Sequence, residues 1–128
     1  DIVQAVLEGV AFAIRDSVEV AKSQGIKIDS SKICGGGSKS PLWRKIFANV
    51  LGIPLQLLKT EQGPGYGGAM LAMVGCGLFD SVQAAADALV EVSATVNPDP
   101  ELTAKYEKRY RQFSLIYPAL KGIFPEIQ

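Results

Sequence analysis

The stretch Lys-Ile-Cys-Gly-Gly-Gly-Ser-Lys-Ser-Pro-Leu-Trp, residues 32–43, decides the fold predicted for this chain. Residues 30–34 are predicted to form a short strand that ends in the apolar pair Ile33 and Cys34 and runs directly into the three glycines at 35–37. A helix should open next, because Ser40 suits its N-cap and Pro41 its first turn, where a missing N–H costs nothing. Glycines leave no side chain between main chain and ligand, and a helix N-terminus favours anionic or hydrogen-bond-accepting groups. The stretch is therefore typical of a nucleotide site.

Two known nucleotide motifs resemble this stretch without matching it fully. A Walker phosphate loop ends in Gly-Lys-Ser/Thr, whereas this stretch reads Gly-Ser-Lys-Ser with another glycine spacing, so that motif is excluded. The dinucleotide fingerprint is nearly matched by Gly35, Gly37 and Ser40, but the acidic residue it requires would be Glu61, which comes late and past the second predicted strand. A dinucleotide-binding oxidoreductase fragment stays open as an alternative. So does a tight strand-to-helix turn without any ligand.

Around the glycine stretch, the sequence pattern predicts alternating helices and strands. An amphipathic helix is expected over residues 1–23, a helix over 41–51 and a second strand over 54–59. Apolar side chains of the second helix should face the core, with Gly52 closing that helix: Leu42, Ile46 and Val50, with Trp43 and Phe47 as further candidates.

The second half of the chain is predicted to be mainly helical. A glycine-rich turn at residues 63–68 should lead into a small-residue helix over 68–74, and Ser81 should cap a helix over 82–90. Residues 91–100 are predicted to be a loop because prolines and an asparagine discourage regular structure. The final helix should be opened by Asp99 and Pro100. It should carry an aromatic stripe until Pro118 interrupts it, and core packing explains such a stripe.

The order of these elements predicts an α/β fold with short parallel strands flanked by helices. Two strands make a poor sheet, since a parallel sheet is normally larger and buried on both faces. The chain also lacks an initiator methionine. We therefore expect residues 1–128 to form a single partial domain, with further strands upstream in a longer protein.

Composition narrows the function classes. The 13 basic and 13 acidic residues cancel, so the chain has no positive field for nucleic acid. Its longest apolar run, residues 69–79, is about half of a membrane span, and no signal peptide is visible. Cys34 and Cys76 are not in a Cys-x-x-Cys motif, which indicates reduced packing thiols in a cytoplasmic protein.

Candidate catalytic groups are scarce. The sequence has no histidine, which excludes a Ser-His-Asp arrangement and removes the commonest metal ligand. Lys39, Arg44 and Lys45 lie near the glycines and could contact phosphate, although such residues are usually solvated. Asp29 has no partner that would make it a general base. We assign no catalytic and no metal-ligating residue to the chain.

Several motifs in order resemble the C-terminal part of the second domain of FGGY-family carbohydrate kinases, most closely the xylulose kinases among them. The resemblance covers nearly the whole chain. It rests on Leu-Glu-Gly-Val-Ala-Phe at residues 7–12, the stretch 35–44, Ala-Asn-Val-Leu-Gly at 48–52, the glycine pair at 67–68 and the tyrosine-rich last helix. Where the family usually shows Gly-Ala-Ala, this chain has Gly-Gly-Ala at 67–69.

The resemblance implies an actin-like, ribonuclease-H-like fold and an ATP-dependent sugar kinase with its active site between two domains. It implies that the residues matching the adenosine motif bind ATP, with the glycine pair of the later segment close to the same pocket: Gly35, Gly36, Gly37, Ser38 and Ser40, then Gly67 and Gly68. The helix N-terminus alone would favour a phosphate group at this loop, whereas the resemblance implies that the adenosine part of ATP binds there. The sugar, the Mg²⁺ ligands and the catalytic base would belong to upstream segments, so the fragment alone should be inactive. A homo-oligomeric parent is compatible with the sequence, and a non-catalytic actin-like interaction domain is a further alternative.

Overall fold

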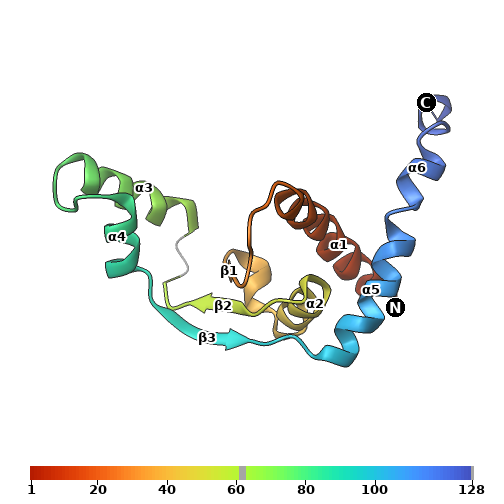
Figure 1. Cartoon of the computed structure of the whole chain (residues 1–128), viewed down its shortest axis with the longest axis horizontal. Helices are drawn as coiled ribbons and strands as arrows, with labels where there is room; N and C mark the ends of the chain where they lie inside the picture. Colours follow the sequence, from red (N-terminus) through yellow and green to blue (C-terminus); the bar gives the residue numbers. More distant parts are fainter. Residues whose placement is uncertain (61–62, 128) are drawn as a thin grey trace.

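A computed structural model describes residues 1–60 and 63–127 of the chain. Figure 1 shows a small central sheet with helices gathered at its two ends. In chain order the elements are α1 (Ile2–Ser23), β1 (Ser31–Ile33), the 3₁₀ turn η1 (Gly36–Lys39), α2 (Pro41–Leu51), β2 (Leu55–Leu58), α3 (Gly63–Gly75), α4 (Val82–Leu89), β3 (Val92–Val96), α5 (Pro100–Phe113), α6 (Ile116–Leu120) and the 3₁₀ turn η2 (Phe124–Glu126).

The sheet has the order β1-β2-β3 and is mixed. β1 and β2 are parallel, with Lys32 opposite Gln56, and α2 forms the crossover between them. β2 and β3 are antiparallel, with Gln56 opposite Thr95. The predicted parallel pair is thus confirmed, but the prediction of parallel strands alone was wrong.

β3 lies where a loop was predicted. Residues 92–96 read Val-Ser-Ala-Thr-Val, a β-branched segment that pairs along β2. Both prolines of the region, Pro98 and Pro100, come after the strand, so they do not interrupt its hydrogen bonds. The prediction of a loop was wrong for residues 92–96, because the prolines act only on the residues next to them.

The main core forms where α1, α2 and α5 meet. Its buried side chains are Ala11, Phe12, Ile46, Val50 and Tyr106, and a second cluster around Leu55 joins α2 to the sheet. This confirms the inward positions of Ile46 and Val50 and the packing role of the aromatic stripe. Leu42, also predicted to face inward, is 56% exposed, because the half-buried Trp43 takes the inward position in the first turn of α2.

A buried polar contact fixes the start of α5 against α2. The Asn49 side chain is 5% exposed, and its Oδ1 accepts the backbone N–H of Asp99 at 2.7 Å. Asp99 in turn caps α5 by accepting the N–H groups of Glu101 and Leu102. The predicted N-cap of the last helix is therefore confirmed, and it is itself held in place.

The break in the last helix comes earlier than predicted. α5 ends at Phe113, and α6 starts at Ile116 with Pro118 inside its first turn. Proline lacks an N–H and its ring clashes with the carbonyl four residues before it, here Ser114. The proline thus interrupts the helix at the residues that precede it.

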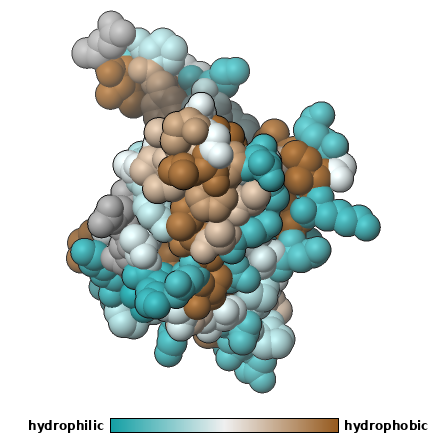
Figure 2. Space-filling model, turned by 90° about the vertical axis from the view of Figure 1, so that its left-hand side faces the viewer, coloured by the Kyte–Doolittle hydropathy of each residue, from teal (hydrophilic) through white to brown (hydrophobic). Residues whose placement is uncertain are grey.

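α3 and α4 form a separate end of the molecule. α3 begins at Gly63, so the predicted glycine turn is in fact the first turns of the helix, where Pro64 is well tolerated. Tyr66 anchors α3 to α4 by donating its hydroxyl to the carbonyl of Leu89 at 2.9 Å. Figure 2 looks at this end and shows apolar side chains over much of it, and α3 has no buried residue. Helices that are apolar all round are normally covered on several sides.

α1 also leaves apolar side chains uncovered. Ile2, Val6, Val10 and Ile14 are between 40% and 83% exposed. The two cysteines, predicted to be packing residues, are exposed free thiols as well, because Cys34 follows the edge strand β1 and Cys76 follows α3. Within residues 1–60 and 63–127, none of the helices combines the length and the hydropathy that crossing a membrane requires.

Candidate functional site

The glycine stretch forms a tight loop between β1 and α2. Gly35 has φ of 86°, a conformation that favours glycine, and its carbonyl accepts the N–H of Ser38 at 3.0 Å. The loop then makes the 3₁₀ turn η1, which ends as Ser40 donates its N–H to Gly37. The predicted direct passage from glycines to helix was therefore wrong by one short turn, and of the three glycines only Gly35 has positive φ.

The predicted start of α2 is confirmed. Ser40 has extended backbone, and its Oγ accepts the N–H of Trp43 at 3.3 Å. Pro41 occupies the first turn, and Gly52, with φ of 66°, ends the helix. These local signals place the glycine loop at the N-terminus of a helix, as expected.

The glycines of the loop differ in what surrounds them. A Cβ atom built on Gly35 or Gly36 would have no atom within 4 Å, apart from its chain neighbours, whereas one built on Gly37 would overlap the ring of Trp43. Gly36 also lacks a positive φ, so the fold itself does not require a glycine there. The loop therefore has an open position at Gly36 and a closed one at Gly37.

Polar groups of the loop are bonded to the loop itself. Ser38 is 1% exposed, and its Oγ donates to the carbonyl of Gly35 at 2.7 Å. Arg44 donates its Nε to the carbonyl of Ser38. The sequence suggested Arg44 as a phosphate contact and gave no sign of this bond to the backbone.

An apolar cavity of about 370 Å³ lies beside the loop. Its lining includes Gly37 and Ser38 from the loop, Trp43 and Phe47 from α2, and Val10 and Ile14 from α1. Few polar groups converge on it, so it lacks the placed donors and acceptors that a nucleotide pocket needs.

The second glycine pair is placed elsewhere. Gly67 and Gly68 lie within α3, which packs chiefly on α4, and they are not among the residues that line the cavity beside the loop. A Cβ atom on either would have no atom of the described chain within 4 Å, apart from its own helix and neighbours. The structure thus does not bring the two predicted parts of the site together at this cavity.

Two further kinds of site would depend on acidic side chains: a metal site and a dinucleotide fingerprint. The described residues contain no cluster of three or more His, Cys, Asp or Glu side chains that could hold a metal ion. Glu61, the acidic residue considered for a dinucleotide fingerprint, lies outside the described residues. The Arg44 side chain and the Ser38 hydroxyl donate hydrogen bonds to carbonyl groups of the loop.

Comparison with known proteins decides the family. Residues 1–76 match the sequence profile described as the FGGY family of carbohydrate kinases, C-terminal domain. The chain belongs to this family. The FGGY resemblance noted from its motifs is thereby confirmed.

Individual relatives of this FGGY chain agree. It is 30% identical over 127 residues to a xylulose kinase of Staphylococcus epidermidis, covering 99% of the chain and 26% of that protein. It is 37% identical over 116 residues to a xylulose kinase of Lactococcus lactis, covering 89% of the chain and 23% of that protein. The FGGY chain thus spans about a quarter of the length of these relatives.

Solved structures confirm the fold. A gluconate kinase from Lactobacillus acidophilus superposes with a TM-score of 0.88 at 23% identity, over 99% of the FGGY chain and 26% of that protein. A xylulose kinase from Rhodospirillum rubrum gives a TM-score of 0.75 at 34% identity, over 94% and 24%. The predicted class, the C-terminal portion of an actin-like, ribonuclease-H-like domain, is therefore correct, with the mixed sheet as its one revision.

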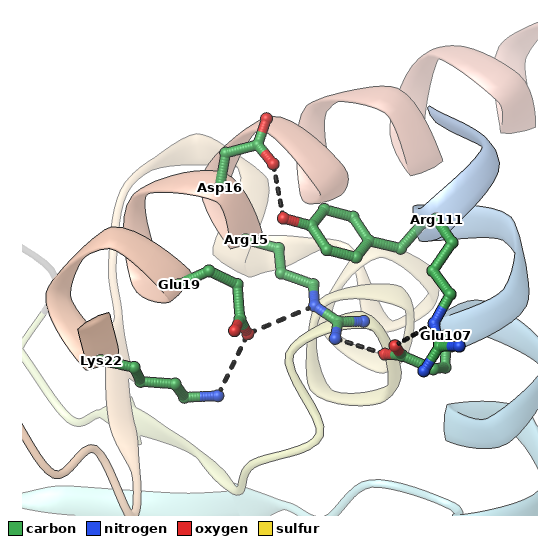
Figure 3. A network of polar contacts seen from close by, with 7 residues as sticks. Arg15, Asp16, Glu19, Lys22, Glu107 and Arg111 are labelled. Atoms are coloured by element: carbon green, nitrogen blue, oxygen red, sulfur yellow. Dashed lines mark hydrogen bonds and ion pairs between the residues drawn. The ribbon is translucent and has the colours of Figure 1, made fainter. Parts of the chain in front are cut away.

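A network of charged side chains joins α1 and α5 of the FGGY chain (Figure 3). Arg15 pairs with Glu107, which also accepts from Arg111 Nε at 3.0 Å. Beside it, the Tyr110 hydroxyl donates to Asp16 at 2.6 Å, and the Arg15 guanidinium carbon lies 4.1 Å from the centre of the Tyr110 ring. Burial, followed by the bond to Asp16, raises the pKa of Tyr110 to about 12. All these groups hold the two helices together, so we interpret the network as structural.

Glu107 gives this network a pH dependence. Hydrogen bonds from Arg15 and then Arg111 lower the pKa of Glu107 below its ordinary value of 4.5. Because its pKa is lowered in the folded state, ionised Glu107 stabilises the fold at pH values above its unfolded-state pKa. This stabilisation is lost as the pH falls through its folded-state pKa. We therefore expect Glu107→Gln to lower the thermal unfolding midpoint at pH 7, with the gap from the wild type shrinking below pH 4.5. Exposed Glu126 supplies the control, Glu126→Gln, and an equal, pH-independent gap in both variants would refute this role.

Proposed function

We propose that the chain is the C-terminal part of an ATP-dependent sugar kinase and contributes the adenosine side of its ATP site. In the complete protein, the γ-phosphoryl group of ATP would pass to a sugar hydroxyl, with D-xylulose as the proposed substrate. This proposal rests on the FGGY family of the chain and on the xylulose kinases among its relatives. Residues 1–128 would form one partial domain of that protein.

The observation that carries the adenosine assignment is the shape of the glycine loop. The loop is fixed on one side by α2, and it is open at Gly36, where a side chain would meet no neighbouring atom. An unobstructed backbone lets a flat nucleoside approach closely and use main-chain N–H and C=O groups. The proposed contact residues are Gly35, Gly36 and Gly37, with Ser38 and Ser40 shaping the loop.

Gly67 and Gly68 form the second part of the proposed ATP site. Both are open on α3, and the described chain offers no packing reason for a glycine at either position. The exposed apolar surfaces of α3 and α1 are consistent with cover by other parts of a longer kinase. Segments that cover α3 would also determine where α3 lies relative to the glycine loop. Its position decides whether the loop and the glycine pair on α3 contact the same nucleotide.

Phosphoryl transfer also needs groups that we place outside these residues. Mg²⁺ would accompany ATP and neutralise charge on its phosphates. We assign the magnesium ligands, the sugar contacts and the general base to other segments of the kinase, and we propose a cytoplasmic location. The isolated chain should accordingly show no kinase activity.

A coupled ADP-release assay on the full-length kinase tests this function. With Mg²⁺ and ATP, it should release ADP with D-xylulose, and less with L-ribulose, gluconate or glycerol. Release with another sugar would support the kinase assignment and change the assigned substrate. A folded protein that releases no ADP with any of them would favour a non-catalytic actin-like interaction domain, and preferential binding of NAD over ATP would favour a dinucleotide-binding oxidoreductase.

A further inference from the structure

We propose that Trp43 is a positioning residue for the nucleotide loop, and that position 37 is a glycine because of the Trp43 ring rather than because of the nucleotide. This inference rests on the proposed function, since it concerns how the adenosine loop obtains its shape. The three glycines look equivalent in the sequence, but under this inference positions 36 and 37 are glycines for different physical reasons.

The contact between Gly37 and Trp43 is closer than any side chain would allow. A Cβ atom on Gly37 would lie 2.6 Å from Trp43 Cζ3 and 2.7 Å from Cε3. Non-bonded carbon atoms are at their optimum near 3.5–4.0 Å, so either the loop or the indole would have to move. At Gly36 the same added atom would meet nothing within 4 Å.

The indole is held on α2 by its backbone and by packing. Trp43 lies in the first turn of α2, where its backbone N–H is bonded to Ser40 Oγ at 3.3 Å. Its ring packs against Phe47, with ring centroids 5.6 Å apart, and its indole N–H has no acceptor within the part of the chain that the structure describes. Packing alone therefore holds the ring, and Phe47 supports it on α2.

A second residue of the same helical turn fixes the other part of the loop. Arg44 donates to the Ser38 carbonyl, and the Ser38 hydroxyl donates to the Gly35 carbonyl at 2.7 Å. Trp43 supports Gly37 while Arg44 supports Ser38, so two consecutive residues of α2 determine the loop. A change at Gly37 or Trp43 should thus alter ATP binding by shifting the loop, with no direct contact between the indole and ATP.

A double-mutant cycle in the full-length kinase tests this pair. Gly37→Ala should raise the KM for ATP about tenfold or more, because relief of the overlap moves the loop or the indole by about 1 Å, with kcat and the KM for the sugar nearly unchanged. In a Trp43→Leu background, Gly37→Ala should cause little further change, because the smaller side chain leaves room for the added methyl group. If position 37 is instead a glycine because the nucleotide needs the space of a side chain there, the methyl group will raise the KM equally in both backgrounds.

The thermal unfolding midpoint separates this inference from the proposed function. Gly37→Ala should lower the midpoint when Trp43 is present and leave it nearly unchanged in the Trp43→Leu background, whether or not the protein is a kinase. Gly36→Ala, one residue away in open space, is the matched control and should leave the midpoint unchanged. If Gly37→Ala lowers the midpoint by the same amount in both backgrounds, the contact between Gly37 and Trp43 is refuted. If the effect of Gly37→Ala on the midpoint depends on Trp43 but the protein releases no ADP, only the proposed function is refuted. Coupled midpoints with an unchanged KM for ATP would overturn the positioning role.

Discussion

Replacing Gly36 by valine should raise the KM for ATP of the full-length kinase by about tenfold or more, the equivalent of about 1.4 kcal/mol of binding free energy. The backbone at Gly36 does not need a glycine, and the space beside it is open, so the variant should fold normally. A branched side chain there would stand between the main chain and an approaching nucleoside. Steady-state kinetics with varied ATP at saturating sugar measures the effect.

Gly122→Val is the matched control for this experiment. Gly122 also has open surroundings and no positive φ, and it follows α6 rather than the glycine loop. The control should keep the wild-type KM for ATP, and both variants should keep the wild-type KM for the sugar. An unchanged KM for ATP in Gly36→Val would contradict the assignment of the loop to adenosine.

Phe12→Ala should have the largest effect on stability, about 3–5 kcal/mol, because it removes a large buried ring. Phe12 is 5% exposed, and its ring contacts the aromatic residues of α5, with its centroid 5.3 Å from that of Phe113 and 6.1 Å from that of Tyr106. The rest of the site should be intact in the folded fraction. Thermal unfolding of the full-length kinase should show a midpoint lowered by several degrees.

The same substitution at an exposed phenylalanine provides the comparison. Phe124 is 48% exposed near the C-terminus, and Phe124→Ala should lower the midpoint far less. Equal midpoints for the two variants would mean that α1 and α5 do not share a core in the complete protein.

The features that sequence predicted well depend on neighbouring residues. Ser40, Ser81 and Asp99 cap their helices because a side-chain oxygen reaches an N–H two or three residues ahead, and Gly52 ends α2 through its own backbone conformation. The family, too, followed from several motifs in order, which is a stronger signal than one glycine pattern.

Other features depend on contacts that no local pattern encodes. β3 exists because β2 offers it a partner 34 or more residues away, as the bond between Ser93 and the Leu57 carbonyl illustrates. The overlap between Gly37 and the Trp43 ring depends on how η1 folds back on α2. Trp43 was among the inward candidates, yet its contact with the glycine loop required coordinates.

The exposed apolar side chains show a further limit of the sequence. Periodicity correctly predicted α1 as amphipathic, but it did not tell which neighbour covers the apolar stripe. In the described fold, Phe12 faces α5 while Ile2, Val6 and Val10 stay exposed. Which side of a helix is buried depends on the elements packed against it, and these are properties of the whole domain.

Photolabelling of the full-length kinase with 8-azido-ATP, which carries its reactive group on the adenine ring, tests the central claim most directly. After irradiation and tryptic digestion, mass spectrometry should find the label in peptides from residues 33–44, and excess ATP should prevent the labelling while excess NAD should not. A label that excess ATP prevents, found only in peptides outside this stretch, would contradict the account.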